Sequence, residues 1–121
     1  MQPLAHTKLQ EFSERFENFK DAEIRSLIVK DATTFELTLV LQDKARAFDW
    51  ITLTLEFNGI IDAKLLEDTQ LSYLDMSEGA SLFTQDGVIY FGIGEDLTPS
   101  LVESASLYIK AKTLKYEEGL F

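Results

Sequence analysis

The chain has 121 residues, no cysteine, one histidine and a formal net charge of −10. Its length indicates a single domain over residues 1–121, and a 45% hydrophobic content is enough for a core of its own. The absence of cysteine excludes disulfides and thiolate zinc sites, and the acidic balance argues against nucleic-acid and anionic-membrane partners.

The first predicted element is a helix at about residues 7–19. Apolar side chains recur there at spacings of three and four residues, and so share one helix face: Leu9, Phe12, Phe16 and Phe19. Thr7 followed by Gln10 is typical of a capping box, and Glu11 with Arg15 has the spacing of a favourable pair along a helix. We expect the phenylalanine face to pack on a sheet.

Alternation of apolar and polar side chains predicts strands in much of the remaining chain. The predicted strands are 23–30, 34–42, 50–57, 60–66, 81–84, 88–93 and 105–116. Turn residues at 31–34, Asn58-Gly59 and Asp86-Gly87 predict hairpins between successive strands. For 105–116 the absence of glycine and proline also permits a helix, but its alternation favours a strand, with Lys110 and Lys112 protecting a sheet edge.

Two segments have weaker patterns. Residues 71–74 suggest a short strand or irregular chain, and Thr98-Pro99 has the composition of a helix start. Together the elements predict an α+β fold, in which an N-terminal helix packs on a largely antiparallel sheet of six to eight hairpin-connected strands. There is no alternation of strands and helices of the kind that a dinucleotide-binding fold requires.

The sequence shows no catalytic constellation. His6 is the only imidazole, and we expect it in a mobile N-terminal segment rather than beside a nucleophile. Gly92-Ile93-Gly94 lacks the residues that complete a phosphate loop. The carboxylates of 67–68, 75, 78 and 95–96 include oxygen ligands for a hard cation, but no calcium-loop spacing is present. We therefore predict no catalytic residue, no metal and no cofactor.

Acidic side chains are concentrated in one segment. Residues 62–103 carry nine carboxylates and one base, Lys64, which gives the segment a net charge of −8. Such a concentration attracts cationic surfaces. Trp50 lies opposite the apolar face of its predicted strand, where it can anchor an interface or support a second layer. The candidate partner-binding residues are Glu67, Asp68, Asp75, Glu95, Asp96 and Trp50.

Two stretches carry a resemblance to known proteins. Phe19-Lys20-Asp21-Ala22-Glu23-Ile24 resembles the Phe-His-Asp-Ala-Glu-Ile entry into a strand in small bacterial domains of unknown function, some of them grouped with immunity proteins of polymorphic toxin systems. The closing segment 108–118 looks like the end of similar chains. Lys20 stands where those domains have histidine, so no role of that histidine is carried over. The resemblance implies an α+β fold and a small bacterial cytosolic protein, and it supplies no catalytic residue.

Three functional hypotheses follow. The first is a non-enzymatic protein-binding module, with an immunity or inhibitor protein as one form, whose acidic 62–103 region engages a basic partner. The second is a small-molecule binder or enzyme with a pocket between helix and sheet, lined by Phe16, Trp50 and Tyr90. The third is a self-associating structural domain. Neither a signal peptide nor an uncharged run longer than residues 87–94 is present, which predicts a cytoplasmic protein.

Overall fold

The computed structural model describes residues 1–71 and 73–121 and shows nine strands in two antiparallel sheets. The strands are β1 (Gln2–Leu4), β2 (Glu23–Asp31), β3 (Thr34–Asp43), β4 (Asp49–Asn58), β5 (Asp62–Lys64), β6 (Ala80–Gln85), β7 (Val88–Ile93), β8 (Tyr108–Ala111) and β9 (Thr113–Leu120). The helices are α1 (Leu9–Arg15) and α2 (Asp68–Leu71), and the 3-10 turns are η1 (His6–Lys8), η2 (Glu17–Phe19), η3 (Lys44–Arg46) and η4 (Val102–Ser104). The predicted α+β class is confirmed, although the strands form two sheets instead of one.

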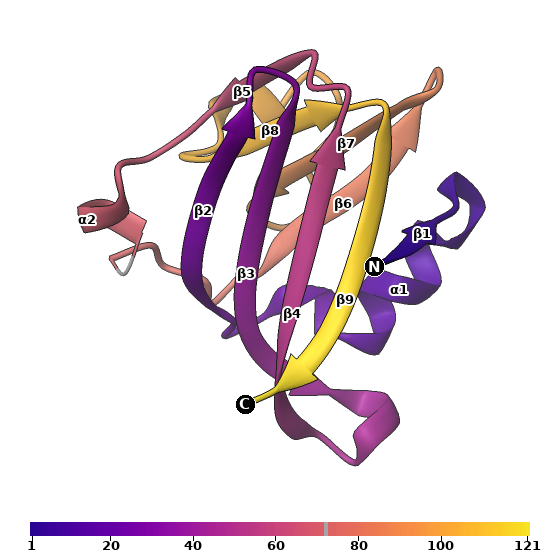
Figure 1. The fold of residues 1–121 in the computed structure, drawn as a ribbon, viewed down its shortest axis with the longest axis vertical. Coiled ribbons are helices and arrows are strands. Elements are labelled where there is room, and N and C mark those ends of the chain that lie inside the picture. Colours follow the sequence, from indigo (N-terminus) through magenta and orange to yellow (C-terminus); the bar gives the residue numbers. More distant parts are fainter. Residues whose placement is uncertain (72) are drawn as a thin grey trace.

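The two sheets pack face to face. One has the strand order β1-β9-β4-β3-β2 and the other β5-β8-β7-β6, and Figure 1 shows the second lying behind the first. The apolar faces of β3 and β4 point between the sheets, where Leu37, Leu39, Leu53 and Leu55 are fully buried. They meet Ile89, Phe91 and Ile109 of the other sheet within one core. Strands β3 and β4 therefore bury the face that their alternation predicts.

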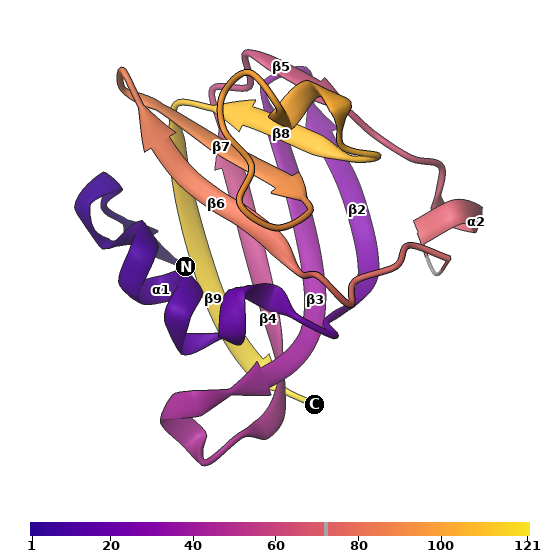
Figure 2. The ribbon, with the colours of Figure 1, turned by 180° about the vertical axis from the view of Figure 1, so that it is seen from behind.

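Helix α1 covers an open side of this sandwich. Figure 2 shows it beside β6 and β9, whereas α2 stands on the opposite side, next to β2, in both ribbon views. Phe12, Phe16 and Phe19 enter the core from the α1–η2 segment, and Phe19 meets Phe91 edge to face with ring centroids 6.0 Å apart. The predicted helical phenylalanine face is thus part of the core.

The continuous helix predicted over residues 7–19 is wrong in its extent. Only Leu9–Arg15 is α-helical, and no side chain caps it at Thr7. Glu17, Asn18 and Phe19 all have positive φ, between 53° and 62°, so the chain leaves the helix through a left-handed turn. That conformation costs an L-residue about 1–2 kcal/mol. The turn places Phe19, which is 0% exposed, in the core.

The hairpin predicted at Asn58-Gly59 is also wrong. Gly59 has the positive φ of a turn residue, at +69°, but the chain crosses to the other sheet, where β5 pairs with β8. The place beside β4 is taken by β9, which pairs with it from Ile51–Leu120 to Asn58–Thr113. In contrast, the hairpins β2–β3 and β6–β7 are confirmed, the second through Asp86 and Gly87 with φ of 54° and 77°.

The predicted strand 105–116 is divided between the sheets. Its first part forms β8 and its second β9, with Lys112 between them. Both strands have neighbours on two sides, so the predicted edge position of Lys110 is wrong. The helix start predicted at Thr98 is a turn that leads to η4.

Of the two alternatives predicted for residues 71–74, a short strand or irregular chain, the described residues 71, 73 and 74 show no strand. The segment includes the end of α2, and Tyr73 follows with 87% of its surface exposed. The prediction for Ser72 lies outside the described residues.

The N-terminal segment is tied to both sheets, contrary to the expectation of a mobile end. Strand β1 pairs with β9. The His6 Nε2 lies 3.0 Å from the carbonyl oxygen of Lys112, and its Nδ1 lies 3.2 Å from the Thr84 hydroxyl. His6 therefore connects the chain ahead of α1 to β6 and to the segment between β8 and β9.

Candidate functional site

A pocket of about 410 Å³ opens between α1, η2, β6 and the loop that follows β7. Its walls combine polar, acidic and apolar side chains from segments far apart in the sequence. They are Gln10, Ser13, Glu14, Asn18, Lys20, Glu78, Ala80, Ser81, Leu82, Phe83, Glu95, Asp96 and Leu97. This volume lies in the range of small-molecule and side-chain binding sites.

The left-handed turn at η2 forms one wall of the pocket. It is held where Gly79 passes directly against the backbone of Asn18, with no room for a side chain between them. The Asp21 amide donates to the carbonyl oxygen of Met76 at 2.8 Å, which fixes the end of the turn. These contacts place Asn18 and Lys20 beside the segment that leads into β6.

The opposite wall is a loop organised by Ser81. The Ser81 hydroxyl donates to the carbonyl oxygen of Gly94 at 2.9 Å and accepts from the Leu97 amide at 3.0 Å. Gly94 has a φ of +136°, a conformation that L-residues rarely adopt. One serine side chain thus closes a loop that presents Glu95 and Asp96 at the pocket.

The pocket is strongly acidic. Glu14, Glu78, Glu95 and Asp96 line it together with one base, Lys20, whose Nζ lies 4.0 Å from the Glu95 carboxylate. Both side chains of this pair are about half exposed, so the contact contributes roughly 0–1 kcal/mol. In the part of the chain that the structure describes, no three acidic or histidine side chains approach closely enough to hold a metal ion.

Ser13 is a pocket-lining residue whose buried hydroxyl makes no hydrogen bond within the described residues. It is on α1, and only 6% of it is exposed. A buried hydroxyl without a partner costs about 1–3 kcal/mol. A buried hydroxyl without a partner therefore lies directly beneath the pocket lining.

The structure separates the acidic side chains that the sequence groups together. Glu95 and Asp96 line the pocket, whereas Glu67 and Asp68 lie at the start of α2, on the opposite side of the sandwich from α1. Asp75 sits in the connection from α2 to β6 and accepts from the Ser77 amide at 2.9 Å, a bond that lowers the pKa of its carboxyl. The −8 segment is thus divided between several surfaces.

Two further acids of that segment share one positive charge. Lys110 lies 2.7 Å from Glu103 and 3.7 Å from Asp62, and Asp62 also accepts from the Tyr108 hydroxyl at 2.9 Å. The bond to Glu103 raises the pKa of Lys110, which therefore keeps its charge. Asp62 and Glu103 consequently contribute less to the attraction of a basic partner than the pocket acids do.

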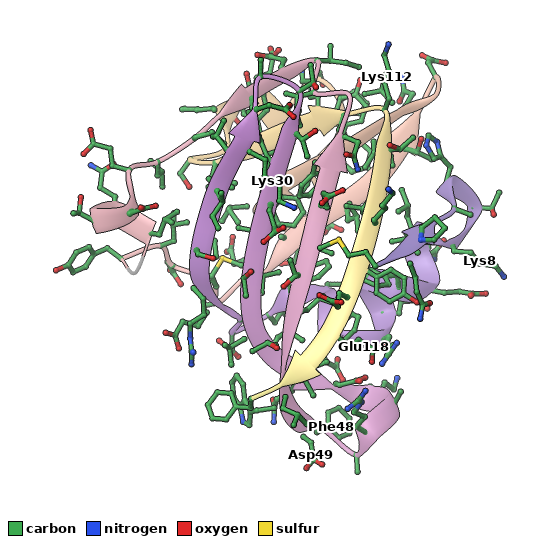
Figure 3. The ribbon with its side chains drawn as sticks, in the orientation of Figure 1. Lys8, Lys30, Phe48, Asp49, Lys112 and Glu118 are labelled. Atoms are coloured by element: carbon green, nitrogen blue, oxygen red, sulfur yellow. The ribbon has the colours of Figure 1, made fainter. Side chains whose placement is uncertain are left out.

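Trp50 lies apart from the pocket lining. It is on β4, on the face of the five-stranded sheet that points away from the core, and 45% of it is exposed. Phe48, also 45% exposed, lies at the same end of the sheet and is labelled in Figure 3. Trp50 thus remains an exposed aromatic residue with no contact to the acidic pocket among those described.

The other liners proposed from the sequence are not in the pocket either. Phe16 is 1% exposed and belongs to the core, and Tyr90 stacks on Phe83 with the ring planes 3° apart. Ser13, Glu14 and Lys20 were not predicted as site residues, because they precede the acidic segment and only the fold brings them to it. Glu14 had a local signal, since it faces away from the phenylalanine face of the helix.

The fold and pocket define a two-sheet α+β protein with an acidic pocket beside its helix. Comparison with protein-family models gave no match, and comparisons with curated proteins and with solved structures gave no significant match. Among the helices of the described residues, none is long and apolar enough to cross a membrane.

Proposed function

We propose that this protein is a non-enzymatic protein-binding module that engages a basic partner through the acidic pocket and its rim. The observation that carries the proposal is the gathering of Glu14, Glu78, Glu95 and Asp96 around one cavity with a single lysine. Charge of one sign around a concave site raises the local concentration of oppositely charged partners and steers their approach.

An immunity or inhibitor protein is the form of this function that we favour. The carboxylates of such a protein would occupy the phosphate-binding site of a basic toxin, for example a nuclease. The resemblance of residues 19–24 to small bacterial immunity domains supports this form. Of these residues Lys20 lines the pocket, and it is the position at which the chain departs from the histidine of those domains. A cytoplasmic location, where such a partner would be met, is part of the same proposal.

Two charge-reversal variants distinguish a specific role of the pocket from a general effect of the protein's net charge. The variants Glu95→Lys/Asp96→Lys and Glu67→Lys/Asp68→Lys each change the formal net charge from −10 to −6, because every reversal adds two charges. We expect the pocket variant to associate about tenfold more slowly with the basic partner, and the α2 variant to stay close to wild type. Partner capture from source-cell lysate, followed by stopped-flow association at two salt concentrations, measures this.

Equal slowing by both variants would contradict a role for the pocket and leave only long-range attraction. Association unchanged in both would contradict the acidic interface as a whole. Circular dichroism of both variants provides the folding control, since all four side chains are on the surface.

A small-molecule site is the second candidate, and the pocket volume of about 410 Å³ favours it. Thermal-shift screening of cationic metabolites separates it from the first. A ligand that stabilises wild type but not the Glu95→Lys/Asp96→Lys variant would support it, and the absence of any pocket-dependent shift would contradict it.

Self-association is the third candidate, supported by the edge strand β2. Ile28 and Val29 on this strand are 49% and 54% exposed, and an open strand edge is a template for pairing with a second copy. A monomer by light scattering across working concentrations would contradict this function.

A further inference from the structure

We propose that the pocket between α1 and β6 receives an arginine side chain of the partner, with Ser13 pairing its guanidinium and Lys20 competing for the same place. This inference rests on the proposed function and specifies the chemistry of its site. It combines three features: apolar walls, separated acidic acceptors and a buried hydroxyl without a partner.

The walls of the pocket fit the stem of a long basic side chain. Ala80, Leu82, Phe83 and Leu97 supply apolar lining beside the carboxylates. Long cationic side chains bury their methylene groups along apolar surface while the charged end seeks polar partners. A small inorganic cation would leave this lining unused.

The acceptors are distributed rather than focused on a point. Glu14 comes from α1, whereas Glu95 and Asp96 come from the loop after β7, and the described side chains form no metal-holding group. A guanidinium presents five N–H donors in a rigid planar fork and can pair with separated acceptors at once. A lysine ammonium carries its three N–H donors on a single nitrogen. The separation of the acidic acceptors around the pocket therefore favours arginine over lysine.

Ser13 provides the observation that points to a ligand independently of charge. Ser13 is one of the pocket-lining residues, and its hydroxyl is buried and lacks a partner among the described residues, so a rotation of the side chain is needed to bring the hydroxyl to the cavity. A guanidinium N–H that enters beside α1 would supply the missing bond. The competing explanation is a rotation of the side chain that lets the hydroxyl donate to the Leu9 carbonyl, one turn earlier in α1.

Lys20 shows that the pocket accepts a cation from the chain itself. Its Nζ is 4.0 Å from the Glu95 carboxylate, in a half-exposed contact that an incoming ligand can displace. Removing this ammonium frees Glu95 and makes the pocket more negative. Binding of a cation should therefore become tighter in a Lys20→Met variant, whereas the loss of an ordinary binding residue weakens it.

The test is a titration with N-acetyl-arginine amide, followed by amide chemical shifts at low and physiological salt. We expect saturable shifts at residues 13, 81 and 95–97, and weaker binding of N-acetyl-lysine amide. Ser13→Ala should weaken arginine binding severalfold, and Lys20→Met should strengthen it severalfold. Lys8→Met is the matched control, because it removes the same charge at an exposed position outside the pocket and should change binding little.

The inference is overturned if shifts spread equally over residues 67–75 without saturation, or if Ser13→Ala and Lys20→Met both bind like wild type. Misfolding is separated by the thermal midpoint, which in Ser13→Ala should equal or exceed that of wild type because alanine is the better helix former and leaves no unpaired hydroxyl.

Failure of the inference and failure of the proposed function give different results. Pocket-dependent capture of a basic protein, with no specific binding of N-acetyl-arginine amide, would overturn the arginine site and leave the protein-binding function. Specific binding of the arginine probe, with no basic protein captured at any salt, would support the site and overturn the protein partner. A free guanidinium compound would then be the source of the ligand.

Discussion

Replacement of Arg15 by methionine should lower the free energy of unfolding by about 3 kcal/mol. The Arg15 guanidinium donates to both carboxylate oxygens of Asp43, at 2.9 and 2.7 Å, and to Glu118 at 2.5 Å. The Asp43 side chain is fully buried, so without Arg15 an acidic group is left inside the protein with incomplete neutralisation. Urea unfolding at neutral pH measures the loss.

The position of this cluster explains why the loss should be large. Asp43 ends β3 and Glu118, labelled in Figure 3, lies near the end of β9, and Arg15 contacts both side chains. Arg15 at the end of α1 therefore joins the helix to two strands. Arg46 Nε also lies 3.4 Å from the Asp43 carboxylate, and the Arg15→Met variant retains this residue. We therefore expect a loss of unfolding free energy in the lower part of the range that is usual for broken buried ion pairs.

Lys30→Met is the matched control for this prediction. Lys30 also bridges two carboxylates, Glu36 at 2.7 Å and Glu56 at 2.9 Å, but it does so on the outer face of the same sheet (Figure 3). Solvent screens that pair of contacts, so we expect a clearly smaller loss than for Arg15→Met. Equal losses of unfolding free energy in Arg15→Met and Lys30→Met would contradict a larger contribution from the buried contacts of Arg15.

The stability difference between wild type and Arg15→Met should shrink in acid. The hydrogen bonds from Arg15 lower the pKa of Asp43 from its ordinary value of 3.8. A carboxyl with a lowered folded-state pKa contributes stability above its unfolded pKa, and that contribution disappears as pH falls through the folded value. The difference between the unfolding free energies of wild type and variant should therefore narrow as pH falls below about 4; a difference independent of pH would contradict this cause.

Replacement of Gly79 by alanine should lower the free energy of unfolding by about 3 kcal/mol. Gly79 has a φ of +77°, and an added Cβ would fall on the carbonyl oxygen of Asn18 in the η2 turn. The left-handed conformation and the backbone overlap both oppose a side chain. Because Asn18 lines the acidic pocket, the displacement should also weaken binding there. Thermal and urea unfolding measure the first effect.

Gly87→Ala separates the two causes, because Gly87 has the same φ of +77° and open space around its Cβ position. It should lose only the conformational part, about 1 kcal/mol. The difference between the two alanine variants measures the overlap with Asn18. Equal losses of unfolding free energy at both positions would show that the backbone conformation alone accounts for the loss in Gly79→Ala.

The sequence by itself determined the α+β class and the positions of most strands, although not β1 or the division of 105–116 into β8 and β9. Alternation places Leu37, Leu39 and Leu53 on one face of their strands, and a one-residue error in phase would move all of them to solvent. Likewise, Asp86-Gly87 predicts its own hairpin, since both residues accept positive φ. These features depend on neighbours within a few residues, and a sequence displays such neighbours directly.

Only the tertiary structure decided how the elements were combined. The choice of β9 rather than β5 as the partner of β4, and the division of 108–120 between two sheets, depend on competition between distant segments. The same holds for Arg15, whose partner is Asp43 across the fold instead of Glu11 on its own helix. The acidic pocket is lined both by α1 and by the loop after β7. The left-handed turn that follows α1 is associated with the burial of Phe19 in the core. Long-range packing, which no local period encodes, therefore decided the site.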